Sequence, residues 1–218
     1  MLQIVERERA NSSSRACSTF QGGFAIGSDR LARSETEWLN VTVLRTPNLL
    51  LRPCSSADRD DFINLERDPE VMRFLNGGPV DHGAIDTRNV KFLMPRGEEP
   101  YVWTARRGAS GEFVGWFCLY PVGRRIAEIG YRLRREDWGQ GFATEGANAL
   151  VEWGFGFAGY SKVVASTLAV NHGSRRVMEK IGMRHVRTSP ADLDFIPGAE
   201  HGEVWYAIDR SNWVAVRS

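Results

Sequence analysis

The residues from Tyr131 to Glu145 have the types and the spacing of a phosphate-binding loop. They read as the end of a strand, a charged turn, a loop containing Gly139 and Gly141, and the start of a helix. A loop of this kind leaves several backbone N–H groups without partners, and the helix behind it adds the positive end of its dipole. We therefore expect a phosphate-bearing ligand at residues 138–144.

Two familiar phosphate motifs do not fit this loop. The dinucleotide fingerprint G-x-G-x-x-G needs glycine where Thr144 stands, and it opens a βαβ unit rather than following several strands. The nucleoside-triphosphate loop needs a Lys-Ser or Lys-Thr pair after the glycines, and none follows here. Taken alone, the loop is also compatible with a tight strand-to-helix turn that binds nothing.

A second segment, Asn171–Met183, follows the glycine loop and changes the interpretation. Together with 128–133 and 138–145 it resembles the GNAT acetyltransferases, and more narrowly the branch that contains the ribosomal-protein alanine N-acetyltransferases. The resemblance covers residues 44–213. In the family's loop pattern, Q/R-x-x-G-x-G/A, the positions are taken by Trp138, Gly141 and Ala143. Tryptophan departs from the broad pattern but suits this branch.

The resemblance implies acetyl-CoA as co-substrate and no metal. It places the cofactor in a cleft where the strand 125–133 diverges from the strand 162–170. The diphosphate would meet the main-chain amides of Gln140, Gly141, Phe142, Ala143 and Thr144. The pantetheine arm would pair with the strand edge near Tyr131, Leu133 and Arg134, and Asn171 would hydrogen-bond it from the next helix. Asn171 can equally serve as a plain helix N-cap.

The resemblance also suggests two proton carriers. Glu128 is the candidate base, acting through a water; the alternative is an exposed strand carboxylate paired with Arg125 or Arg132. Ser174 is the candidate acid for the departing thiolate; the alternative is a serine that only caps a helix. At pH 7, deprotonating an α-amine of pKa about 7.7–8.0 costs ~1 kcal/mol, against ~4.6 kcal/mol for a lysine of pKa about 10.4. A base therefore matters more for lysine than for an N-terminus.

Hydrophobic periodicity predicts the α/β class, with a mixed α+β sheet. An antiparallel meander precedes a strand-helix-strand-helix crossover and a C-terminal strand. The expected strands are 44–53, 101–105, 113–120, 125–133, 162–170 and 203–208. Proline should end the first and the third of these. The expected helices begin at Ser55 or Ser56 and at Asp68, and others cover 80–93, the segment after Gly141, and 171–181.

We expect one acetyltransferase domain over residues 43–218. Residues 1–42 show no sustained period and are predicted to be a poorly ordered extension. Two alternatives are a natural start near Val41 or Val43, and a functional arm.

Composition narrows the function classes. Lys+Arg is 28 and Asp+Glu is 27 in 218 residues, so the formal charge of +1 offers no general field for a nucleic acid. Cys17, Cys54 and Cys118 are widely spaced, and no apolar run or leader predicts a membrane or secreted protein. We expect a cytoplasmic, homodimeric enzyme that acetylates a protein N-terminal α-amine or a small-molecule amine. The alternative is a non-catalytic acyl-CoA sensor or interaction module on the same fold.

Overall fold

The computed structural model describes residues 42–75, 77–79, 97, 99–191, 193 and 195–217. The expected N-terminal extension, apart from Thr42, and the expected helix at 80–93 therefore lie outside the described residues.

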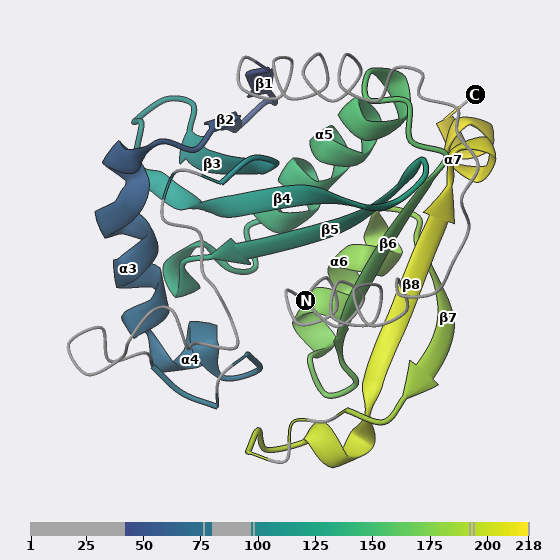
Figure 1. The fold of residues 1–218 in the computed structure, drawn as a ribbon. Helices are drawn as coiled ribbons and strands as arrows, with labels where there is room; N and C mark the ends of the chain where they lie inside the picture. The colour runs from purple at the N-terminus through teal and green to yellow at the C-terminus, as the bar shows by residue number, and fades with distance from the viewer. Residues whose placement is uncertain are drawn as a thin grey trace, which may run out of the picture.

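The described strands form one mixed sheet in the order β1-β2-β3-β4-β5-β6-β8-β7 (Figure 1). All neighbouring pairs are antiparallel except β5 and β6, which are parallel and joined through a helix. This confirms the predicted α/β class with its antiparallel meander and single crossover. The strands are β1 (Leu44–Arg45), β2 (Leu49–Pro53), β3 (Val102–Arg107), β4 (Phe113–Gly123), β5 (Ile126–Leu133), β6 (Lys162–Leu168), β7 (Arg184–Ser189) and β8 (Glu203–Asp209).

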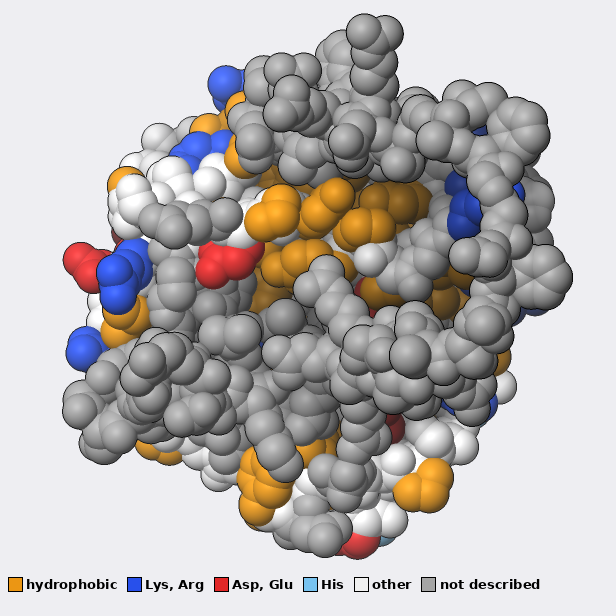
Figure 2. Space-filling view, viewed as in Figure 1, with side chains coloured by type: hydrophobic (Ala, Val, Ile, Leu, Met, Phe, Trp, Pro, Cys, Tyr) orange, Lys and Arg blue, Asp and Glu red, His pale blue; other side chains and the backbone are white. Residues whose placement is uncertain are grey.

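Helices cover both faces of the sheet. The α-helices are α3 (Arg59–Arg67), α4 (Pro69–Met72), α5 (Phe142–Gly156), α6 (His172–Lys180) and α7 (Arg210–Arg217). Short 3-10 turns are η1 (Ser56–Asp58), η2 (Arg135–Asp137) and η3 (Ala199–His201). Helices α5 and α6 pack on one face in the main core, whereas α3 and α4 pack on the other face against β3 and β4. On this second face, hydrophobic side chains gather in a hollow near its centre (Figure 2).

The first proline prediction was confirmed, because β2 ends at Pro53, whereas the second was wrong. The predicted strand 44–53 is divided into β1 and β2, because Pro47 lies in a turn between them that is closed by the bond from Thr46 N to Leu49 O. Proline suits this turn because its ring fixes φ. Pro121 does not end β4, which continues to Gly123. Strand β3 pairs with β4 only as far as Cys118, so Pro121 lies where β4 has an open edge and its missing N–H breaks no bond on that side.

Two elements were missed. Strand β7 is an edge strand whose residues, apart from Ser189, are exposed, so it lacks the alternation that marks a half-buried strand. Helix α7 follows β8 directly, and Trp213 on it packs against Phe155 with ring centroids 5.6 Å apart. Strand β6 also ends at Leu168, two residues earlier than predicted, because the chain turns toward α6 there.

The parallel pair is short. Strand β5 pairs with β6 at Ile126, Ala127 and Glu128, opposite Lys162, Val163 and Val164. Beyond Glu128, β5 continues alongside β4, whereas β6 continues alongside β8. Residues 129–133 of β5 therefore border a widening gap instead of a neighbouring strand.

Helix α5 lies close to the sheet at Gly146, and also at Gly154, where an added Cβ would lie 2.8 Å from Leu119 Cδ2. A Cβ added to Gly146 would overlap the ring of Phe117, which is fully buried in β4. Gly156, at the end of the same helix, has no atom within 4 Å of such a Cβ.

The matched variants Gly146→Ala and Gly156→Ala test this contact. Gly146→Ala is expected to destabilise the protein by about 1–3 kcal/mol because the buried ring cannot move aside without strain. Gly156→Ala should leave stability unchanged or raise it by up to about 1 kcal/mol, since alanine favours the helix. Urea unfolding measures both. Equal stabilities for the two variants would contradict the close packing of α5 on Phe117.

Candidate active site

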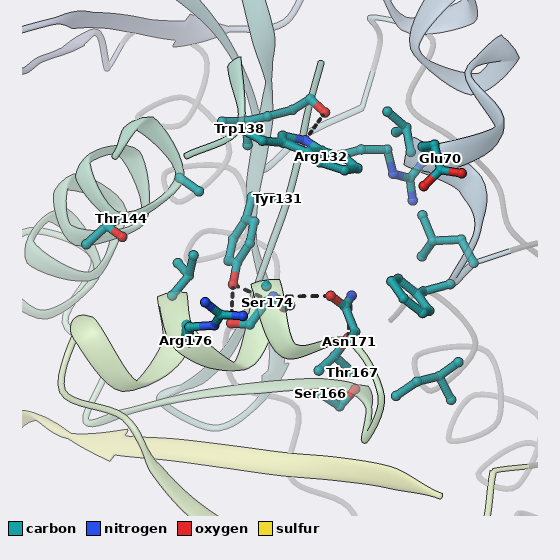
Figure 3. A pocket seen from close by; sticks show the side chains of 18 of the residues that line it. Glu70, Tyr131, Arg132, Trp138, Thr144, Ser166, Thr167, Asn171, Ser174 and Arg176 are labelled. Atoms are coloured by element: carbon teal, nitrogen blue, oxygen red, sulfur yellow. Dashed lines mark hydrogen bonds between the residues drawn. The ribbon is translucent and has the colours of Figure 1, made fainter. Parts of the chain in front are cut away.

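A cleft of about 540 Å³ opens where β5 and β6 diverge. Its walls come from β5, the loop 137–144, β6, α6, α4 and the segment 190–193 (Figure 3). Eight of the residues predicted from the sequence to bind the cofactor or to catalyse the reaction line this cleft. They are Tyr131, Leu133, Gly141, Phe142, Ala143, Thr144, Asn171 and Ser174. Arg134, Gln140 and Glu128 are not among the lining residues.

One end of the cleft is formed by the N-terminus of α5. Gly139 and Gly141 have φ of +74° and +87°, a backbone conformation that favours glycine. Gly141 is the N-cap of α5, and no side chain caps the helix. The first-turn amides of Phe142, Ala143 and Thr144 therefore have no acceptor within the helix. A Cβ on either glycine would meet nothing within 4 Å, so the space above the loop is open.

These features fit a diphosphate. Unpaired amides and the helix dipole favour an anion at this end. Arg176 and Lys180, one turn apart on α6, line the same cleft and bring positive charge from the opposite wall.

A buried carboxylate holds the loop in place. Asp137 has a fully buried side chain and accepts from Arg107 Nη2 at 2.6 Å and from Arg134 Nε at 2.9 Å. Gln140 Nε2 donates to the carbonyl of Glu136 at 2.7 Å. The side chains of Arg134 and Gln140 are thus engaged in shaping the loop rather than turned into the cleft.

Ser174 is held by its neighbours on both sides. The Tyr131 hydroxyl on β5 donates to the Ser174 carbonyl at 3.1 Å and lies 3.2 Å from Ser174 Oγ, where either oxygen can donate. Burial raises the pKa of the Tyr131 phenol, so this group stays protonated at neutral pH. The pair bridges the gap between β5 and α6, as Figure 3 shows.

Asn171 has the cap geometry that the sequence allowed. Its Oδ1 accepts the Ser174 N–H at 3.2 Å, and its Nδ2 donates to Thr167 Oγ1 at 3.1 Å. Helix α6 ends at Lys180, with Gly182 in the predicted C′ position, where the N–H groups of Gly182 and Met183 bond to the carbonyls of Glu179 and Met178. Both ends of α6 are therefore fixed by bonds that set the position of Ser174.

Glu128 lies at the last paired rung of β5 and β6, opposite Val164. It is 3 % exposed, so it is not the exposed strand carboxylate that the sequence left open. Its side chain shares a face with Tyr120, its partner on β4, and points away from the α5 side. Tyr131 lies three positions further along β5, about 10 Å away.

Several lining residues were not predicted. Arg176 and Lys180 could have been found, because they repeat at helical spacing after Asn171. The lining residues of α4 and of the turn after it, together with Ser166 on β6, gave no signal, because nothing local in the sequence shows that these segments meet. They are Glu70, Val71, Phe74, Leu75 and Ser166.

The described ranges contain neither a candidate metal site nor a helix that could span a membrane. No group of three or more His, Cys, Asp or Glu side chains there could hold a metal ion. No helix within those ranges has the length and apolar character needed to cross a bilayer.

The comparisons with known proteins agree with this architecture. Residues 48–184 match the family model described as an acetyltransferase (GNAT) domain. The chain is 34% identical over 185 residues to the FsC-acetyl coenzyme A-N(2)-transacetylase of Aspergillus fumigatus, covering 80% of this chain and 79% of that protein. It is 28% identical over 106 residues to the putative ribosomal N-acetyltransferase YdaF of Bacillus subtilis, covering 48% of this chain and 57% of that protein.

A solved structure extends the match to three dimensions. The crystal structure of a GNAT-family acetyltransferase from Bacillus anthracis superposes with a TM-score of 0.65 at 25% identity, covering 78% of this chain and 99% of that one. With the family model matching more than half of the chain, the conclusion is direct: this protein belongs to the GNAT acetyltransferase family and is an N-acetyltransferase.

Proposed function

We propose that the protein transfers the acetyl group of acetyl-CoA to the primary amine of a small molecule. The observation that carries this proposal is the uncapped N-terminus of α5, which faces the Tyr131–Ser174 pair across the cleft. The similarity to a transacetylase named for an N(2) amine supports a small-molecule acceptor. A protein N-terminal α-amine is the second candidate, supported by the resemblance to the ribosomal branch and by the more limited similarity to YdaF.

Donor binding would use the main chain. The amides of residues 140–144 would hold the diphosphate, with Arg176 and Lys180 adding charge from α6. The pantetheine arm would lie along residues 129–133 of β5, where the strand borders the gap and offers its backbone groups. Asn171 already uses both polar atoms of its side chain, so bonding the arm would require Nδ2 to leave Thr167.

The thioester supplies an activated acyl group, so the chain's own residues need only orient the reactants and move protons. In the proposed reaction a C–N bond forms and the C–S bond breaks. Glu128 accepts the amine proton through water, since it lies at the junction of the two strands. Ser174 Oγ gives its proton to the departing sulfur and is reprotonated from solvent, to which Glu128 releases the amine proton, while Tyr131 stays protonated and holds Ser174 in place. The non-catalytic alternative is not favoured, because the similar protein with a named activity is a transacetylase.

A thiol-release assay tests the proposed function. Acetyl-CoA is incubated with a panel of amino acid amides, polyamines, amino acids and peptides with free N-termini, and free CoA is counted with a thiol reagent. Burial raises the pKa of Cys54 to about 11 and raises the pKa of Cys118 as well, so both thiols react slowly at neutral pH. Replacing Cys17 with serine removes the third protein thiol. We expect amine-dependent release; acetyl-CoA binding without release on any amine would instead support the sensor reading.

The variant Ser174→Ala distinguishes a catalytic role of the Ser174 hydroxyl from a structural role at the start of α6. The N-cap bond uses the Ser174 backbone N–H, so alanine preserves the cap while removing the hydroxyl. We expect kcat to fall about 10²-fold with little change in the KM for acetyl-CoA. Tyr131→Phe should give a smaller loss in the same direction, and Ser110→Ala, on an exposed hairpin, should give none. Full activity in a normally folded Ser174→Ala variant would leave Ser174 as a structural residue only.

Glu128→Gln tests the base. We expect kcat/KM to fall about 10²–10⁴-fold near neutral pH because the carboxylate no longer accepts the amine proton. The loss should be larger for a lysine ε-amine than for an α-amine, since about 3.6 kcal/mol more is needed to deprotonate it at pH 7. Raising the pH above about 8 should restore part of the rate with α-amines. The control is Glu152→Gln, an exposed carboxylate on α5; equal losses in both variants would exclude a role for Glu128 as base.

A further inference from the structure

Ser166 is a buried hydroxyl in the cleft that the proposed chemistry does not use. It is 1 % exposed and lines the cleft, and among the described residues its Oγ has no hydrogen-bond partner. A buried hydroxyl without a partner costs roughly 1–3 kcal/mol, so it calls for a ligand or a water in the cleft.

Ser166 faces the opposite side of β6 from the donor machinery. Successive residues of a strand point to opposite faces, and the next residue, Thr167, accepts from Asn171 on the α6 side. Ser166 shares its face with Val164, two residues earlier, which pairs with Glu128. The hydroxyl and the candidate base are therefore diagonal neighbours on one face, at the point where β5 and β6 part.

Apolar side chains form part of the wall near Ser166, beside Glu70 and Arg132, which also line the cleft. Leu168, two residues on, belongs to a small core cluster against which Phe74 and Leu193 are packed. Phe74 and Leu193 also line the cleft, together with Val71 and Leu75. Figure 3 shows Ser166 on the same side of the cavity as Thr167 and Asn171, with Glu70 across the opening. The positive groups Arg176 and Lys180 come from α6, on the other face of β6.

We propose that Ser166 forms the floor of the acceptor subsite, and that this subsite takes a primary amine carried on an apolar side chain. The inference rests on the proposed function and names its acceptor class. The neutral amine donates one N–H to Ser166 Oγ, which leaves the nitrogen lone pair free to attack the thioester carbon. The apolar part of the acceptor lies against Phe74, Leu168 and Leu193.

An amide series measures the apolar preference. Glycinamide, alaninamide and leucinamide share an α-amine of similar pKa and carry no carboxylate that would meet Glu70 or Glu203 in the cleft. We expect kcat/KM to rise along the series, with leucinamide at least about tenfold better than glycinamide, since a buried leucine side chain gains about 1.5–3 kcal/mol. Phe74→Ala should reduce this ratio, mainly by lowering kcat/KM for leucinamide. A flat or reversed series in the wild-type protein overturns the apolar acceptor class.

Ser166→Ala tests the floor of the subsite, with Ser161→Ala as the matched control. Ser161 is exposed at the start of the same strand, where its Oγ bonds only the Arg125 carbonyl. We expect Ser166→Ala to raise the KM for leucinamide roughly three- to tenfold, the equivalent of one lost hydrogen bond. The KM for acetyl-CoA should stay within about twofold of wild type. Thermal unfolding of both variants establishes that each is folded.

The outcomes separate this proposal from the proposed function. A Ser166→Ala variant that matches Ser161→Ala in its KM for leucinamide overturns the role of Ser166. A rise in the KM for acetyl-CoA alone places Ser166 on the donor side and also overturns it. Turnover on other amines but on none of the amides removes the acceptor class and leaves the acetyltransferase activity intact. Absence of turnover on every amine would instead count against the proposed function itself.

Discussion

The cleft depends on the early end of the pairing between β5 and β6. Each of these strands stays paired with its antiparallel partner, β4 or β8, along most of its length. The position of the cleft is therefore set by the residue at which the parallel pairing stops. It stops at Glu128 and Val164. From this point the sheet divides into two arms. The candidate functional residues lie between the two arms or where they part.

The two arms are held at a defined separation by side chains rather than by backbone pairing. Tyr131 reaches from β5 to Ser174 on α6, and Asn171 ties the start of α6 to Thr167 on β6. On the other side of the gap, Gly146 lets α5 approach the Phe117 ring closely. Because the N-terminus of α5 and Ser174 are positioned by separate contacts, these two ends of the cleft are set independently.

The parts of the site with a local sequence signal could be predicted. The glycines at 139 and 141 and the helical period after them located the loop and α5, and the Asn-to-Gly segment from Asn171 to Gly182 located α6 with its cap and its end. The roles of Arg134 and Gln140 depend on Asp137 and Glu136, and these local contacts cannot be read from charge alone. The error at Pro121 had the same origin, since proline is tolerated there only because β3 stops short of it.

Contacts between distant segments could not be predicted. A serine inside a strand, such as Ser166, looks the same in a sequence whether it faces a packed core or a cleft. Strand β7 could not be predicted because nearly all its residues are exposed at the sheet edge, so its sequence does not alternate between apolar and polar residues. Helix α4 gave a clear start signal, since Asp68 accepts from the N–H groups of Glu70 and Val71, but nothing indicated that it would form a wall of the cleft.

The buried carboxylate under the glycine loop has a consequence for how tightly an anion can be held. Asp137 accepts from two arginines, Arg107 and Arg134, and so fixes the turn before any ligand arrives. A preorganised loop loses little conformational entropy when a ligand binds. Ordering a flexible loop on binding would instead lower the affinity for the ligand. Residues 138–144 are thus ordered during folding, and the free energy of each amide–phosphate bond would be available for holding the proposed ligand.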